Sequence, residues 1–204
     1  MTTQFAALSC FALTLMLVAA PAAAQPLTEQ ERGLVLKHLQ QTRQAFLDSI
    51  AGLSDAQWTF KAAPDRWSIA EVAEHIALSE TTIFQLITTK LLASPPFQRD
   101  PNGMTDEQLT AGVLDRTNRF QAPEILRPTN RWATRDALAK DFIAARDKTE
   151  AYVKATTDDL RGHGAPHPVV KMLDGYQWLL FLSAHSGRHT AQINEVKESP
   201  GYPK

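Results

Sequence analysis

The chain has 204 residues, of which 44% are hydrophobic and 21% are charged, and its formal net charge at pH 7 is -1. These values are typical of one globular domain. Because basic residues are not in excess, the charge gives no sign of nucleic acid as a partner.

The first 24 residues differ in composition from the rest of the chain. An uncharged apolar run over residues 5–20 is followed by Ala22-Ala23-Ala24 and then Gln25. A short apolar run before small residues is typical of a cleaved export signal, and this run is short for a membrane span. An uncleaved anchor is the alternative, since no Lys or Arg precedes the run. We expect a signal peptide over residues 1–24 and a mature domain over residues 25–204.

Cleavage at this site predicts a periplasmic or secreted protein without stable membrane insertion. It also removes Cys10, the one cysteine of the chain. Disulfides and cysteine nucleophiles are thereby excluded from the mature domain, and any metal must be held by nitrogen or oxygen ligands.

Hydrophobic periodicity and capping residues predict four helical segments in the mature domain. They begin near Thr28, Ser68, Thr134 and Asp174. The first two starts have the sequence of a capping box, TEQE and SIAE. The second segment extends to about residue 92 and the fourth to about residue 197.

Between the second and third segments lies a proline-containing stretch, residues 94–133. A loop of this length is uncommon and indicates a lid, a crossover or a flexible segment. We expect it to be the longest irregular segment, and no part of the chain has a convincing strand pattern. The predicted fold class is therefore all-α, a four-helix bundle with one long crossover between the second and third helices.

The fourth segment contains two histidines, His185 and His189, in the sequence HSGRH. Residues four apart lie one above the other on a helix, so their imidazoles can converge on one ion. Apolar residues on the same ridge, including Trp178 and Leu182, turn the pair toward the bundle interior. His75 lies beside the inner stripe of the second segment, and bundles build metal sites from facing helices. From spacing alone, a three-histidine metal site and ordinary core histidines are both open.

Two other metal motifs are excluded by the residues present. Position 186 is Ser, so HSGRH is not the zincin motif HExxH, and no carboxylates have the Glu-x-x-His spacing of di-iron bundles. Three protein ligands with an open position is the catalytic pattern, whereas a structural zinc normally has four. A fourth ligand from Glu71 or His167 would close the site. Otherwise we expect His167 to be a solvated loop residue.

Two motifs far apart in the sequence, APDRWSIAEVAEHI and HSGRHTAQI, are accompanied by LSDAQW and QAPEILRPTNRW. Together they resemble the DinB/YfiT-like superfamily of four-helix-bundle metalloenzymes, over nearly all of the mature domain. The resemblance implies that His75, His185 and His189 bind a divalent metal ion, which in the family is zinc or nickel.

Three further residues are candidates for the site. Glu71 precedes His75 by one turn and either caps its helix with Ser68 or acts as a general base or ligand support. Gln192 lies on the ligand face and can orient a ligand or bind substrate. Arg188 lies one residue off that face, which favours a surface ion pair at least as much as substrate binding.

A three-histidine ion with an open position can polarise a substrate, bind a thiolate or convert water to hydroxide. The resemblance implies the thiolate, because several members are S-transferases that use small thiols, while export argues against it because those thiols are cytosolic. We predict an exported metal-dependent transferase or hydrolase acting on a small molecule, such as a low-molecular-weight thiol. The alternative is a non-catalytic metal-binding or stress-related binding protein. The sequence leaves a homodimer open.

Overall fold

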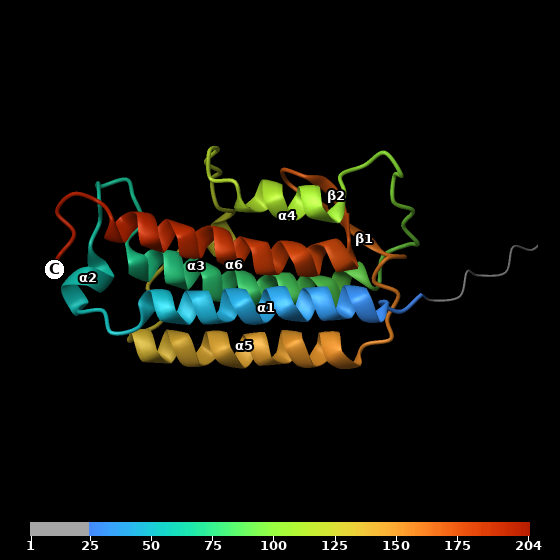
Figure 1. Ribbon diagram of the computed structural model, residues 1–204, viewed down its shortest axis with the longest axis horizontal. Helices are drawn as coiled ribbons and strands as arrows, with labels where there is room; N and C mark the ends of the chain where they lie inside the picture. Colours follow the sequence, from blue (N-terminus) through green and yellow to red (C-terminus); the bar gives the residue numbers. More distant parts are fainter. Residues whose placement is uncertain (1–24) are drawn as a thin grey trace, which may run out of the picture.

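The computed structural model describes residues 25–204, and the predicted export signal, residues 1–24, lies outside the described residues. Four long helices lie side by side and form the bundle (Figure 1). They are α1 (Glu29–Ile50), α3 (Ile69–Gln85), α5 (Arg135–Ala155) and α6 (Gly175–Lys197). Helices α1 and α3 each pack against both α5 and α6. The predicted four-helix bundle is confirmed.

The starts of the four helices agree with the sequence prediction because each is fixed by a local cap. Side chains of Thr28, Ser68 and Asp174 accept a hydrogen bond from the backbone three residues later and form capping boxes, and Thr134 caps α5 in the same way. Such caps satisfy backbone N–H groups that the first turn of a helix leaves unpaired. Helix α3 continues into a π-helical turn, η1 (Leu86–Leu91), and so ends where predicted.

The crossover between α3 and α5 contains more structure than the sequence predicted. Residues 94–133 include a helix, α4 (Asp106–Leu114), and a 3-10 turn, η2 (Glu124–Leu126). Leu109 and Val113 of α4 are buried where this helix packs against α6. Nine residues rarely form a stable helix alone, so packing on α6 supplies the stability of α4. The expectation of a long irregular segment is corrected accordingly.

A small β-hairpin precedes α6, although the sequence analysis found no convincing strand. Strands β1 (Gly164–His167) and β2 (Lys171–Asp174) are antiparallel, with Gly164 opposite Asp174 and His167 opposite Lys171. Each strand has only four residues, which is too short for an alternating pattern to be recognised. The short α2 (Asp55–Thr59) lies at the opposite end of the bundle (Figure 1).

A buried ion pair joins the four long helices in the middle of the bundle. The side chains of Arg146 and Glu80 are fully buried, and two guanidinium nitrogens lie 2.8 and 2.7 Å from the two carboxylate oxygens. The guanidinium also donates to the Leu39 carbonyl and the Thr42 hydroxyl on α1, and to the Ser186 hydroxyl on α6. Because a buried charge is tolerated only when it is paired and hydrogen-bonded, these contacts fix the four helices relative to one another.

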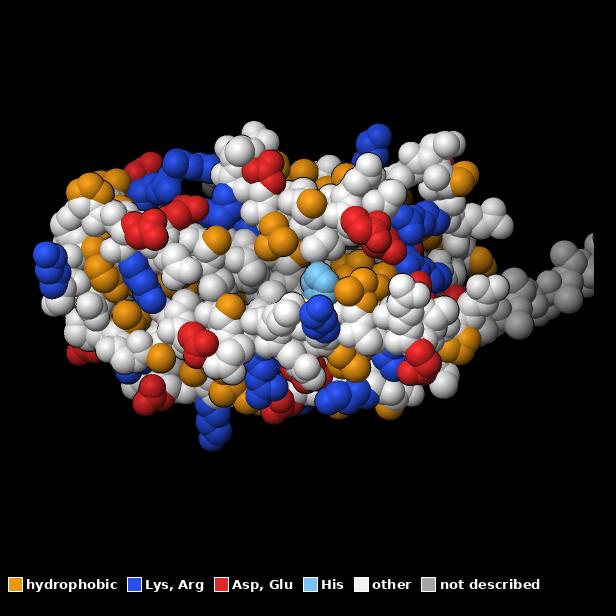
Figure 2. All heavy atoms as spheres, viewed as in Figure 1, with side chains coloured by type: hydrophobic (Ala, Val, Ile, Leu, Met, Phe, Trp, Pro, Cys, Tyr) orange, Lys and Arg blue, Asp and Glu red, His pale blue; other side chains and the backbone are white. Residues whose placement is uncertain are grey.

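On the face shown in Figure 2, acidic and basic side chains are intermixed. Among residues 25–204, no helix is both long and apolar enough to cross a membrane.

Candidate metal centre

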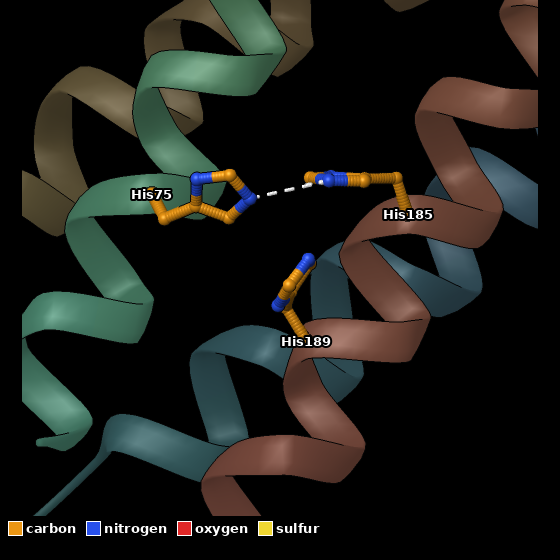
Figure 3. Close-up of side chains that lie close together, drawn as sticks. All are labelled: His75, His185 and His189. Atoms are coloured by element: carbon orange, nitrogen blue, oxygen red, sulfur yellow. Dashed lines mark hydrogen bonds between the residues drawn. The ribbon is translucent and has the colours of Figure 1, made fainter. Parts of the chain in front are cut away.

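The three predicted histidines meet between α3 and α6 (Figure 3). One potential ligand atom from each of His75, His185 and His189 lies within 4.8 Å of the other two. The ring centroids are 4.4 to 5.0 Å apart. Histidines on facing helices of the bundle are thus brought together, which is one of the two arrangements that their spacing left open.

The protonation of His75 is set by the crossover. Its Nδ1 lies 2.8 Å from the carbonyl oxygen of Leu126 at the end of η2. A carbonyl only accepts hydrogen bonds, so Nδ1 carries the proton and Nε2 keeps a lone pair. Nε2 lies 3.2 Å from Nε2 of His185, at the centre of the cluster.

His189 is held in the same manner by Gln192. Its Nδ1 lies 2.8 Å from the amide oxygen Oε1 of Gln192, which fixes the proton on Nδ1 and leaves Nε2 as the potential ligand. Hydrogen bonds of this kind orient metal-binding imidazoles and raise their basicity. Gln192 therefore makes the contact expected of a residue that orients a ligand.

His185 differs from the other two histidines. Its Nδ1 is buried and has no hydrogen-bonding partner within residues 25–204, whereas Nδ1 of His75 and of His189 each have an acceptor. Its Nε2 faces that of His75. Two imidazole nitrogens so close together require a proton or a cation between them. The cluster therefore fits a divalent cation that accepts nitrogen ligands.

Burial keeps all three imidazoles uncharged at neutral pH. It lowers the pKa of His75 and lowers that of His189 to about 3. The pKa of His185 is lowered well below its ordinary value, first by burial and then by the neighbouring His189 and His75. Since only the neutral imidazole donates a lone pair to a metal, the site is in its ligating form.

Neither of the two candidates for a fourth ligand reaches the cluster. Within the described part of the chain, the group able to share one ion at this point consists of the three histidines. The carboxylate of Glu71 accepts the backbone N–H of Ser68 and pairs with Lys61, each at 2.7 Å. Glu71 thus caps α3.

His167 lies on the hairpin and is not the solvated loop residue that we expected. Its ring lies 4.5 Å from that of Phe181 and 5.3 Å from that of Trp178, between centroids. Its Nδ1 accepts hydrogen bonds from the backbone of Val169 and Val170. Burial lowers the pKa of His167 to about 4.

Sequence reasoning missed the role of Glu74, which directly precedes His75. Its buried carboxylate accepts the backbone N–H groups of Thr129 at 2.7 Å and Asn130 at 2.9 Å. Asn130 has a left-handed backbone, with φ of 61°. A carboxylate on a helix thus binds a turn of the crossover just beyond Leu126. In the sequence, this role was indicated by the position of a charged residue on the inner side of the predicted helix.

Arg188 has the corresponding role on α6, and its prediction as a surface or substrate-binding residue was wrong. The side chain is buried, and its guanidinium donates to the carbonyls of Val113, Asp115 and Asn118. These carbonyls lie at the end of α4 and in the loop that follows, where helical carbonyls lack partners. Only the folded crossover shows this, because the acceptors are about 70 residues away in the chain.

The fold and this cluster define a class of four-helix bundles with an inward-facing three-histidine site. The family model of the DinB superfamily matches residues 38–193, and the chain belongs to this superfamily.

Individual relatives are distant. The uncharacterized protein YuaE of Bacillus subtilis (strain 168) is 25% identical over 151 residues, which is 74% of this chain and 90% of YuaE. Among solved structures, YfiT from Bacillus subtilis, a probable metal-dependent hydrolase with an unusual four-helix bundle topology, is similar with a TM-score of 0.55. The two sequences are 14% identical, and the match covers 90% of this chain and 94% of YfiT. The four-helix bundle protein TT2238 is 20% identical, with a TM-score of 0.48 over 80% of this chain and 98% of that chain.

Proposed function

We propose that the protein is a metal-dependent hydrolase in which His75, His185 and His189 hold a divalent cation, zinc or nickel. The observation that carries this proposal is the convergence of three neutral imidazoles, His75 buried and the other two half-buried, without a fourth protein ligand in the described residues. The likeness of the fold to YfiT, a probable metal-dependent hydrolase, supports the reaction class.

A bound divalent cation would act as a Lewis acid and lower the pKa of a water or thiol at its open position. The protein supplies the geometry. Leu126 and Gln192 fix the rings of His75 and His189 and direct their Nε2 atoms inward. Such preorganisation is what a catalytic site requires, because little reorganisation then opposes the reaction.

Thiol transfer is the second candidate. Aromatic rings lie against two of the histidines, with centroids of Trp67 5.1 Å from His75 and of Phe181 5.5 Å from His185. A polarisable sulfur atom makes favourable contacts with aromatic rings. A non-catalytic metal-binding protein would be favoured by a fourth protein ligand, and none reaches the cluster within residues 25–204.

Metal analysis of protein purified without a histidine tag tests the proposal. We expect one equivalent of metal, its loss in His189→Ala, and its retention in His38→Ala, since His38 lies outside the cluster. Ester-hydrolysis and thiol-transfer screens of the metal-loaded protein then separate the two reactions. Equal metal content in the wild type and His189→Ala would refute the site.

A further inference from the structure

A small surface pocket lies beside the candidate metal centre, between the loop that precedes α3 and the last turns of α6. Arg66 and Trp67 line it from the loop, and Gln192, Glu195 and Val196 line it from α6. Its cavity volume is about 30 Å³, and the pocket is open to solvent on one side. It therefore has room for a group of a few atoms, such as a carboxylate, at one end of a small molecule.

Two walls of this pocket also support the candidate ligands. Gln192 holds the Nδ1–H of His189 at 2.8 Å, and the ring of Trp67 lies 5.1 Å from that of His75. A molecule in the pocket thus contacts residues that position two of the three histidines. The pocket adjoins the metal centre and does not belong to a separate part of the protein.

Three of the residues that line the pocket carry side-chain hydrogen-bond donors without partners among residues 25–204. They are the guanidinium of Arg66, the indole N–H of Trp67 and the side-chain amide of Gln192, whose oxygen alone is used by His189. All three donor groups are exposed enough to reach a ligand. Donors in excess of acceptors favour an anion.

Glu195 is the one carboxylate among the residues that line the pocket, and its charge is already compensated. Its two oxygens lie 2.5 and 2.7 Å from Nε and Nη2 of Arg116. This bidentate pair lowers the pKa of Glu195. Arg66 also acts on Glu195 through its charge but forms no ion pair within residues 25–204, so Arg66, Arg116 and Glu195 together leave a net positive charge for a ligand.

We propose that this pocket binds the carboxylate group of a small molecule whose reacting end lies at the metal centre. A carboxylate is planar and matches the forked donors of a guanidinium, while Val196 provides an apolar contact for a short alkyl chain. The position of the reacting end rests on the proposed function. The carboxylate subsite rests on the pocket alone.

Titration with propionate tests the subsite without reference to catalysis. In the ¹⁵N-labelled protein, as purified and again after removal of metal by a chelator, propionate should give saturable shifts of the Arg66 Nε–H and Trp67 indole N–H resonances. Propionamide, its neutral counterpart, should not. Arg66→Ala should weaken propionate binding by about tenfold or more, because a charged hydrogen-bonded pair is lost. The control Arg131→Ala removes an exposed guanidinium elsewhere and should bind as the wild type does.

A second variant separates charge from structure. Gln192→Glu retains an acceptor for His189 but places a negative charge in the pocket, so it should also weaken propionate binding. Equal binding of propionate and propionamide, or unchanged binding in Arg66→Ala, would overturn the subsite. Because the metal-free titration needs no metal, its failure is distinct from that of the proposed hydrolase.

The link between pocket and metal has its own measurement. With zinc-loaded protein, at least one of a series of ω-mercapto acids of increasing chain length should bind more tightly than propionate. That advantage should vanish in His189→Ala, where propionate itself still binds. If no mercapto acid binds more tightly than propionate, the pocket and the metal centre do not share a ligand.

Discussion

Glu74 on α3 and Arg188 on α6 bind the same crossover at two different places, and each directly precedes a candidate metal ligand in the sequence. Glu74 accepts backbone N–H groups of the crossover, and Arg188 donates to its carbonyls. Between these two anchors lies Leu126, whose carbonyl accepts from His75. The crossover is thereby attached to both helices that carry the histidines, and its placement determines the orientation of one of them.

Glu74→Gln should weaken metal binding by roughly 10–100-fold, as is typical when a residue that supports a ligand is changed. The two oxygens of Glu74 accept from Thr129 and Asn130 separately, and an amide has only one oxygen. The turn just beyond Leu126 should then loosen, and the hydrogen bond from His75 to the Leu126 carbonyl should weaken with it. Competition with a chromophoric chelator measures the affinity. Glu107→Gln, on the exposed side of α4, is the control, and an unchanged affinity in Glu74→Gln would contradict the role of the anchor.

Acid should destabilise the metal-free protein before the carboxylates titrate. The pKa of His189 falls from 6.5 to about 3 on folding. Between these values the unfolded chain binds the proton and the folded protein does not. The free energy of unfolding should therefore decrease as the pH falls below 6.5, by at most about 1.4 kcal/mol per pH unit for each such histidine. Urea unfolding at several pH values measures the slope, which should be shallower in His189→Ala. Identical slopes would show that His189 is not buried in the neutral form.

Removing one charge of the buried ion pair should lower the free energy of unfolding more than removing both charges. Arg146→Met leaves the carboxylate of Glu80 buried without its cation, and should lower the free energy of unfolding by about 3–5 kcal/mol. The double variant Arg146→Met, Glu80→Met removes both charges and should be more stable than the single one. Urea unfolding of both proteins gives the comparison. A double variant less stable than Arg146→Met would mean that Glu80 does not depend on Arg146.

The prediction that the protein is exported depends on the sequence alone, and it can be tested in cells. We propose that the mature chain begins at or near Gln25 and is located in the periplasm or outside the cell, because small residues follow the apolar run. N-terminal sequencing of the protein from the periplasmic fraction gives the start directly. Soluble protein that retains Met1 would rule out cleavage.

Local signals predicted the helices and the histidine cluster. The starts at Thr28, Ser68 and Asp174 depend on side chains within three residues, so they can be read from a short stretch of sequence. The meeting of His75 with His185 followed from inward ridges on two helices. The same spacing brought Gln192 to His189.

The features that the sequence did not reveal depend on distant partners. Helix α4 is stabilised by burial against α6, and Arg188 binds carbonyls that reach it only through that packing. In the hairpin, Lys171 has a left-handed backbone, with φ of 64°. Glycine and asparagine are the residues that usually indicate this conformation, and neither stands at this position. The partner of Arg146 lies 66 residues away, and nothing in the local pattern identifies Glu80.

The Arg146 guanidinium donates five hydrogen bonds, and these affect how the protein can bind a metal. Sliding α6 by one turn would break the bond to Ser186 and carry His185 past His75. The helices are therefore locked in register without any ion. In a zinc finger, the free energy of metal binding drives folding. In this protein the bundle is held without the ion, so the three histidines would bind a metal as a rigid chelator. Occupancy can then vary with the supply of metal while the bundle keeps its shape.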